Sequence, residues 1–208
     1  MELNSLTAVG PLDGRYRKKI ESLDRYFSEF ALIQYRTQVE ILYFIHLHTL
    51  GLPQLPPLFP VYEIGLHKFY QQFFLALSDC VIAFEKQTNH DVKAVEYFIK
   101  QALAKGDFSD EVKGRSEFIH FGLTSQDVNN TATPMMLRDA LHEVYLPQLE
   151  EVLKQLGDMT ERNRLIPLLA RTHGQAASPT GLGYSNCLDL TPPPKSILTM
   201  GWQKSLII

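Results

Sequence analysis

Residues 22–50 contain neither Gly nor Pro, and apolar side chains recur through them at helical spacing. Side chains three or four positions apart lie on one face of an α-helix, so this stretch predicts one long helix. Gly51 follows it, and four prolines up to Pro60 prevent the helix from continuing. The apolar positions are Leu23, Phe27, Phe30, Leu42, Ile45 and Leu50.

Helical spacing returns in three later segments, and a polar stretch at residues 106–114 separates the second from the third. In the third of these segments four leucines follow a three-four-three spacing, which is typical of a helix lying lengthwise against another helix. No alternating run predicts a strand, so the expected fold class is all-α. The apolar positions are Leu66, Phe69, Phe73 and Leu77, then Val92, Val95, Ile99 and Leu103, then Leu146, Leu149, Leu153 and Leu156.

The last residues differ from everything before them. After Thr180 the helical periodicity stops, and Gly181, Gly183 and a run of three prolines from Pro192 follow without an amphipathic element. We expect residues 181–208 to be a poorly ordered tail with the character of a frameshifted end.

Charge and cysteine content exclude several classes of protein. A formal net charge of -3, with basic residues scattered along the chain, provides no surface for nucleic acid. Cys80 and Cys187 are far apart and outside any metal-ligand spacing, so we expect a reducing, cytoplasmic location. The N-terminus lacks a signal sequence and no apolar run could span a bilayer, so no membrane partner is expected.

The first polar segment that could carry chemistry is the turn from Pro11 to Tyr16. Its Arg15 could donate two parallel hydrogen bonds to a phosphate or carboxylate. Taken alone the segment is weak, because most neighbouring Arg and Tyr side chains are ordinary surface residues.

The second segment, Thr88-Asn89-His90-Asp91, comes just before a predicted helix. A helix N-terminus offers free backbone N–H groups and a favourable dipole to an anion, which a His could reinforce. The alternative is a capping sequence, because Thr, Asn and Asp are all favoured caps, and without other context capping is the preferred interpretation.

The third and fourth segments contain hydroxyls and a histidine. Thr124-Ser125-Gln126-Asp127 fits the Thr-x-x-Asp capping box at the start of another helix, and its hydroxyls and exposed amides also suit an anion. His173 lies beside Gly174 in a polar loop, where an imidazole could donate or remove a proton. As an isolated residue, a loop His is more often a bystander.

No metal or cofactor site is predicted. His46 and His48, two positions apart on a helix, face different directions. Glu117-x-x-His120 matches one unit of a di-iron bundle, but such bundles need that unit twice.

The order and the sequences of these segments resemble those of one family, adenylosuccinate lyase of the bacterial type, in the aspartase/fumarase superfamily. The resemblance covers residues 1 to about 180. Its segments are Ser5–Val9 with Pro11–Tyr16, Thr88–Phe98, Ser116–Phe121, Thr124–Asn130 and Arg171–Gln175.

The resemblance implies an all-helical fold of the fumarase/aspartase type. It implies an N-terminal helical domain in residues 1–112 and the start of a central long-helix bundle in residues 113–180. Family members assemble as homotetramers, which we do not expect of these 208 residues alone. By the same resemblance, His173 is the general acid, and the residues contacting the substrate are Arg15, Tyr16, Asn89, His90, Asp91, Thr124 and Ser125.

The implied reaction eliminates fumarate from adenylosuccinate to give AMP, and from the succinylated carboxamide ribotide (SAICAR) to give AICAR. These are steps of AMP and IMP biosynthesis. Removing a carbon-bound proton builds negative charge on the neighbouring carboxylate, which preorganised donors must stabilise. The substrate is therefore a small succinylated purine nucleotide, and no cofactor is needed.

The family's catalytic base is a Ser in a loop reading Ser-Ser-x-Met-Pro-x-Lys-x-Asn-Pro, which these 208 residues do not contain. We therefore expect the chain, tested alone, to be inactive. Two alternatives stay open at this point. One is another fumarate-releasing enzyme such as argininosuccinate lyase. The other is a non-catalytic helical interaction module with its leucine seam exposed.

Overall fold

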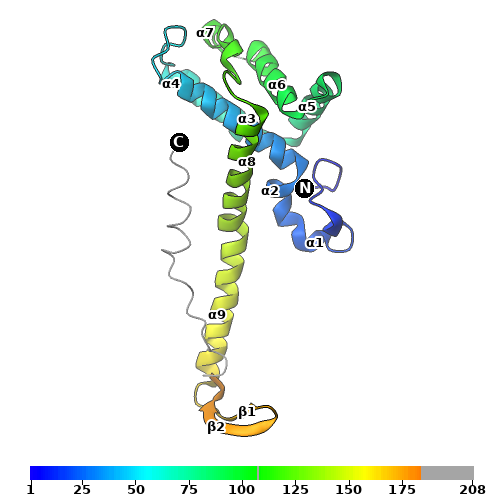
Figure 1. Ribbon diagram of the computed structural model, residues 1–208, viewed down its shortest axis with the longest axis vertical. Helices are drawn as coiled ribbons and strands as arrows, with labels where there is room; N and C mark the ends of the chain where they lie inside the picture. Colours follow the sequence, from blue (N-terminus) through cyan, green and yellow to red (C-terminus); the bar gives the residue numbers. More distant parts are fainter. Residues whose placement is uncertain (107, 184–208) are drawn as a thin grey trace. The chain divides into compact units, whose positions relative to one another are not determined.

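The computed structural model describes residues 1–106 and 108–183, and most of these are helical. The chain divides into two compact units, Met1–Val144 and a second that begins at Tyr145. The α-helices of the first unit are α1 (Arg17–Ile20), α2 (Asp24–Phe27), α3 (Glu29–Leu47), α4 (Pro60–Gln71), α5 (Leu75–Thr88), α6 (Asp91–Lys105), α7 (Asp110–Lys113) and α8 (Ser125–Ala140) (Figure 1). Short 3-10 turns lie at Pro11–Asp13, Glu21–Leu23 and Ser116–Phe118.

The long helix predicted for residues 22–50 begins later than expected. Ser28 has an extended backbone and its side chain accepts a hydrogen bond from the Ala31 N–H at 3.2 Å, so α3 starts at Glu29. Ser is a favoured N-cap, and this local interaction overrides the apolar periodicity before it. The helical segment predicted from Leu66, Phe69, Phe73 and Leu77 is likewise two helices, because Phe74 is extended between α4 and α5. The helix predicted around Val95 is confirmed as α6.

Helix α3 is the element around which the first unit packs. It contacts α4, α5, α6 and α8, which Figure 1 shows around it. On one side Ile33, Ile41 and Phe44 join the main core with residues of α4 to α6. Burying one such side chain stabilises a fold by roughly 1.5–3 kcal/mol, so this cluster fixes the position of α6 against α3.

A second apolar cluster fixes the start of α8. Tyr35 and Val39 of α3 pack with Val92 of α6 and Val128 of α8. Val92 and Val128 each lie in the first turns of their helices. The N-termini of α6 and α8 are therefore packed against the same face of α3.

The second unit contains α9 (Leu146–Asn163) and a β-hairpin of β1 (Pro167–Thr172) and β2 (Gln175–Gly181). A π-helical segment, Leu141–Tyr145, precedes α9. The leucine seam predicted a helix, which is confirmed, and α9 has no buried residue in the described part of the chain.

The expectation that no strand occurs was wrong for residues 167–181. The strands are antiparallel, with Leu168 opposite Thr180 and a register shift between Leu169 and Arg171. That irregular register and the prolines in both strands hide any period-two pattern. The available sequence signal was the pair His173-Gly174, since Gly is common in tight hairpin turns. In the structure both residues have positive φ, 53° and 77°, as such a turn requires.

The predominantly helical fold is confirmed, with this hairpin as its only sheet among residues 1–106 and 108–183. The tail expected at residues 181–208 lies outside the described residues except for its first three. In the described part of the chain, no helix combines the length and apolarity needed to cross a membrane.

Candidate functional site

The junction between α5 and α6 consists of two residues in unusual conformations. Asn89 ends α5 in the left-handed region with φ 51°, and its N–H donates to the Glu85 carbonyl at 2.7 Å. His90 is extended and its Nδ1 accepts a hydrogen bond from the Lys93 N–H at 3.2 Å. The capping interpretation of this segment is therefore confirmed, but the cap is the imidazole. Because Nδ1 accepts from an N–H, the proton of neutral His90 is on Nε2.

The first residue of α6 is held by a buried arginine of α3. Arg36 Nη2 lies 2.7 Å from Asp91 Oδ2, and Arg36 Nε donates to Asn129 Oδ1 at 2.9 Å. Burial acts to raise the pKa of Asp91, but Arg36 and the backbone of Val92 outweigh it and hold that pKa below its ordinary value. Asp91 is therefore a carboxylate at neutral pH, committed to a structural ion pair.

The capping box predicted at the start of α8 is confirmed. Thr124 Oγ1 accepts from the Asp127 N–H, and Asp127 Oδ2 accepts from the Thr124 N–H at 2.7 Å. Hydrogen bonds from the Thr124 hydroxyl and backbone lower the pKa of Asp127. Thr124 and Asp127 satisfy each other, which leaves Ser125 at the first helical position with its hydroxyl available.

The structure brings these two helix starts together. His90 Nε2 lies 3.4 Å from Ser125 Oγ, although the two residues are 35 positions apart in sequence. Each helix N-terminus carries N–H groups without intrahelical partners and the positive end of a dipole. A half-buried hydroxyl and an exposed imidazole thus lie between two N-termini, an arrangement suited to binding an anion.

A second histidine lies just before α8. His120 Nδ1 is 2.5 Å from Glu40 Oε1, and Glu40 is a fully buried residue of α3. His120 has a positive φ of 62°, and its carbonyl accepts from the Leu123 N–H at 3.3 Å. Burial raises the pKa of Glu40, and the hydrogen bond and charge of His120 oppose that rise.

Arg15 and Tyr16 are exposed near the chain start and interact locally. The Arg15 guanidinium lies 5.5 Å from the centre of the Tyr16 ring. Within the described residues, no hydrogen bond or ion pair joins either of them to the N-termini of α6 and α8. The neighbouring Arg17, not Arg15, bridges two carboxylates, those of Asp13 and Asp24, at 2.7 Å each.

His173 belongs to the second unit and occupies the hairpin turn with φ 53°. Its side chain is exposed. The location expected from the sequence, a loop beside Gly174, is correct, and the structure adds that the loop is a two-residue turn between paired strands.

Sequence reasoning missed two buried supports of the site, Arg36 and Glu40. The signal that could have found them was a charged side chain among the apolar positions of the predicted helix, because buried charges are rare unless paired. Among the described residues, no group of three or more His, Cys, Asp or Glu side chains could hold a metal ion.

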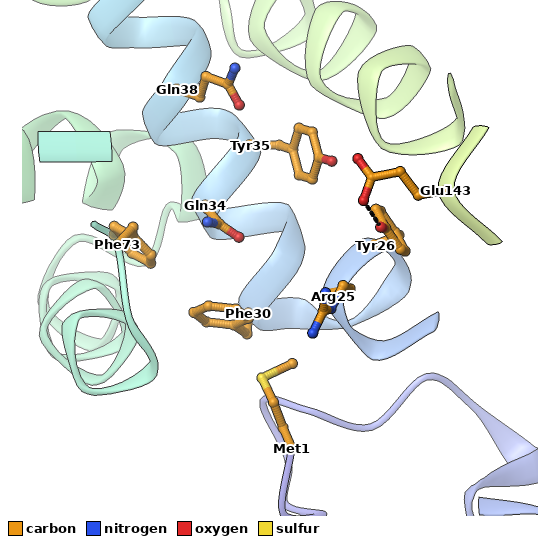
Figure 2. Close-up of a pocket in the computed structure, with 9 residues that line it drawn as sticks. All are labelled: Met1, Arg25, Tyr26, Phe30, Gln34, Tyr35, Gln38, Phe73 and Glu143. Carbon is orange, nitrogen blue, oxygen red and sulfur yellow. Dashed lines mark hydrogen bonds between the residues drawn. The ribbon is translucent and has the colours of Figure 1, made fainter. Parts of the chain in front are cut away.

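A cavity of about 400 Å³ lies elsewhere in the first unit (Figure 2). On the cavity wall, Tyr26 Oη donates a hydrogen bond to Glu143 Oε2 at 2.5 Å. Burial of the phenol, and after it the hydrogen bond to Glu143, raise the pKa of Tyr26 to about 12. None of the predicted site residues lines this cavity, so we place the chemistry at the helix N-termini. Its lining residues are Met1, Arg25, Tyr26, Phe30, Gln34, Tyr35, Gln38, Phe73 and Glu143.

Comparison with known proteins identifies a family and several relatives. A family model described as "Lyase" matches residues 71–187. The chain is 47% identical over 189 residues to the adenylosuccinate lyase of Dictyostelium discoideum, and 42% identical over 184 residues to that of Escherichia coli K12. Each match covers 88% of this chain and 40% of the relative, so the chain spans less than half the length of these relatives.

Two solved structures share the fold. A fumarate lyase from Mesorhizobium sp. BNC1 superposes with a TM-score of 0.59 at 20% identity, covering 80% of this chain and 36% of the other. The β-carboxy-cis,cis-muconate cycloisomerase of Acinetobacter calcoaceticus sp. ADP1 gives a TM-score of 0.54 at 21% identity, covering 79% and 36%. At this identity the likeness concerns the fold alone.

Proposed function

This chain belongs to the lyase family whose model matches residues 71–187, and on that premise we propose that it is the N-terminal part of an adenylosuccinate lyase. The reaction is the elimination of fumarate from adenylosuccinate to give AMP, and from SAICAR to give AICAR. Identities of 47% and 42% to proteins of that name support this substrate over others.

The observation that carries the proposal is the contact between His90 and Ser125 at 3.4 Å. It joins two segments whose sequences resemble the family's substrate-binding segments. Both substrates and the product fumarate are anions, which the N–H groups and dipoles of two helix starts attract. In the proposed site, Asn89 and His90 from the α5–α6 junction and Thr124 and Ser125 from α8 face the substrate.

Asp91 has a supporting role in this proposal. Its carboxylate would repel an anionic substrate, but its 2.7 Å ion pair with Arg36 neutralises that charge. Arg15 and Tyr16 remain part of the proposed site by resemblance. We assign His173 the role of general acid, which protonates the departing nitrogen.

Domain boundaries and assembly belong to the same proposal. Residues 1–112 form the N-terminal domain and residues 113–180 begin the central domain of a cytoplasmic enzyme. The complete enzyme would be a homotetramer without a cofactor. Support comes from family membership and from α9, a helix of 18 residues with an apolar seam.

Two measurements on the 208-residue chain test the function. In a calorimetric titration, adenylosuccinate should bind and argininosuccinate should not, which separates the two fumarate-releasing lyases. In a fumarate-release assay, the chain should show no turnover, because these residues contain no Ser-Ser-x-Met-Pro loop. Fumarate release that disappears in His173→Ala would contradict the proposed inactivity.

A second function, a helical interaction module, is favoured by one observation. Helix α9 has no buried residue in the described part of the chain, and Val152 is 53% exposed on it. Exposed apolar faces of this kind mark association surfaces. Sedimentation of the purified chain tests it: a discrete complex without substrate binding would favour the module over the lyase.

A further inference from the structure

Glu40 is a carboxylate in the middle of α3 with no access to solvent. Its relative exposure is 0%, and its Oε1 is 2.5 Å from His120 Nδ1. Its other oxygen, Oε2, is buried without a hydrogen-bond partner in the described part of the chain. Burying a carboxylate costs free energy, and an unpartnered oxygen adds to that cost.

A neutral side chain of similar size would avoid this cost. Burial raises the pKa of Glu40 despite the opposing contact with His120, so the ionised side chain is less favourable here than its neutral form. The carboxylate at this position is therefore not explained by stability. Among the described residues its hydrogen-bond partner is His120, so the explanation must lie in that contact.

The contact determines what the imidazole can do. With Nδ1 donating to Glu40, the ring can use only Nε2 toward anything else. The His120 side chain keeps 15% of its surface exposed, and His120 Nε2 is not among the buried unpartnered atoms of the described residues. The His120 carbonyl accepts from the Leu123 N–H at 3.3 Å, next to the N-cap Thr124, which places His120 near the start of α8.

We propose that Glu40 is a positioning residue, which holds His120 by Nδ1 so that Nε2–H points toward an anion bound between the N-termini of α6 and α8. The proposal rests on the anion site of the proposed function.

The arrangement on α3 supports this role. Arg36 and Glu40 are four positions apart, hence one turn apart on the same face of the helix. Arg36 holds Asp91 at the start of α6, and Glu40 holds His120 before α8. One rigid helix thus orients groups from both segments that contribute to the site.

The experiment compares the wild-type chain with Glu40→Gln, using inorganic phosphate and fumarate as probes. Affinities come from calorimetry, and stability comes from urea unfolding of the same samples. Nitrogen-15 NMR of the His120 ring reports which ring nitrogens carry protons. In Glu40→Gln the neutral amide keeps the size of the side chain, but its oxygen is a weaker acceptor than a carboxylate and its NH2 can face Nδ1 instead. We therefore expect undiminished stability at pH 7, altered ring signals, and about tenfold weaker anion binding.

Glu96→Gln is the matched control, because Glu96 is also a buried carboxylate but pairs with Lys93 and Lys100 at 2.6 and 3.1 Å. It should lose stability and keep anion affinity. Equal loss of affinity in both variants would mean a general disturbance of the fold and overturn the proposal. Unchanged affinity in Glu40→Gln would overturn the positioning role alone, whereas a wild-type chain that binds neither probe would overturn the anion site and the positioning role together.

Discussion

Arg36 of α3 and Asp91 at the start of α6 form an ion pair with 2.7 Å between Nη2 and Oδ2, in which the Arg36 side chain is only 6% exposed. The guanidinium also donates a hydrogen bond to the side-chain oxygen of Asn129 in α8. A single buried side chain therefore ties two helix starts to a third helix. The consequences can be measured one interaction at a time.

Asp91→Asn should reduce the free energy of unfolding by about 1 kcal/mol, because the variant leaves Arg36 buried with only neutral partners while Asp91 itself is half exposed. Urea unfolding at pH 7 measures the loss. Asp110→Asn is the control, since Asp110 opens α7 and no ion pair of the described residues includes it. It removes the same favourable charge from a helix start, so a loss of equal size in both variants would argue against the Arg36 contribution.

The pH dependence of the Asp91 contribution follows from its lowered pKa. A carboxylate whose folded pKa lies below its unfolded value, near 3.8 for Asp, stabilises the fold above that value. The contribution is lost as the pH falls through the folded pKa. The stability difference between wild type and Asp91→Asn should therefore be constant from pH 7 to about 5 and shrink at more acidic pH. A difference that grows on acidification would contradict the assignment.

Glu40 should behave in the opposite sense, because burial raises its pKa. Its contribution to stability is fully present below the unfolded value of 4.5 and is lost as the pH rises through the folded pKa. Glu40→Gln should therefore equal or exceed wild type in stability at pH 7, by up to about 1 kcal/mol, and the gap should close on acidification. Thermal unfolding across this pH range is the measurement, and a variant destabilised only at pH 7 would contradict it.

His90→Asn separates capping from anion binding at the α6 start. Asn is among the best N-caps, so stability should stay within about 0.5 kcal/mol of wild type. The loss of Nε2 beside Ser125 should weaken phosphate binding about tenfold. His67→Asn, the same change on α4 where His67 contacts Tyr70, should leave binding unchanged. Retained affinity in His90→Asn would show that His90 only caps the helix.

Two glycines of the second unit should respond oppositely to the same substitution. A Cβ at Gly174 would meet no atom within 4 Å, but its φ is +77° in the hairpin turn. Gly174→Ala should therefore destabilise the hairpin by about 1 kcal/mol, seen as faster amide exchange in β1 and β2. Gly157 lies inside α9 with open space around it, and Gly157→Ala should slow exchange in that helix, since Ala is favoured there by about 1 kcal/mol. Identical effects at both positions would contradict the turn geometry.

Local signals predicted more of this molecule than long-range ones could. The cap at His90 and the capping box of Thr124 and Asp127 depend on residues three positions apart, so the sequence could indicate both helix starts. The 3.4 Å approach of His90 to Ser125 depends on how α6 and α8 pack against α3, which apolar periodicity does not specify. From the sequence, only the family resemblance indicated that the two segments contribute to one site.

The main wrong predictions were helices that continue through breaks in apolar stretches. Periodicity continued across Ser28 and Phe74, where the backbone is extended and the helices stop. Periodicity reports which face is buried, not whether the backbone hydrogen bonds are continuous, so it joined helices that pack into one core. The hairpin around His173 was missed because its strands lack alternation.

The two-residue junction of Asn89 and His90 determines how far this region can vary in length. Asn89 ends α5 and His90 caps α6, so no position between the two helices is free of a role. Inserting or deleting a single residue there would rotate α6 relative to Arg36 and move the imidazole away from Ser125. The connection between α3 and α4, with twelve residues between Leu47 and Pro60, carries no such constraint. In an alignment of relatives, gaps should therefore gather in the longer connection and be absent from the shorter one.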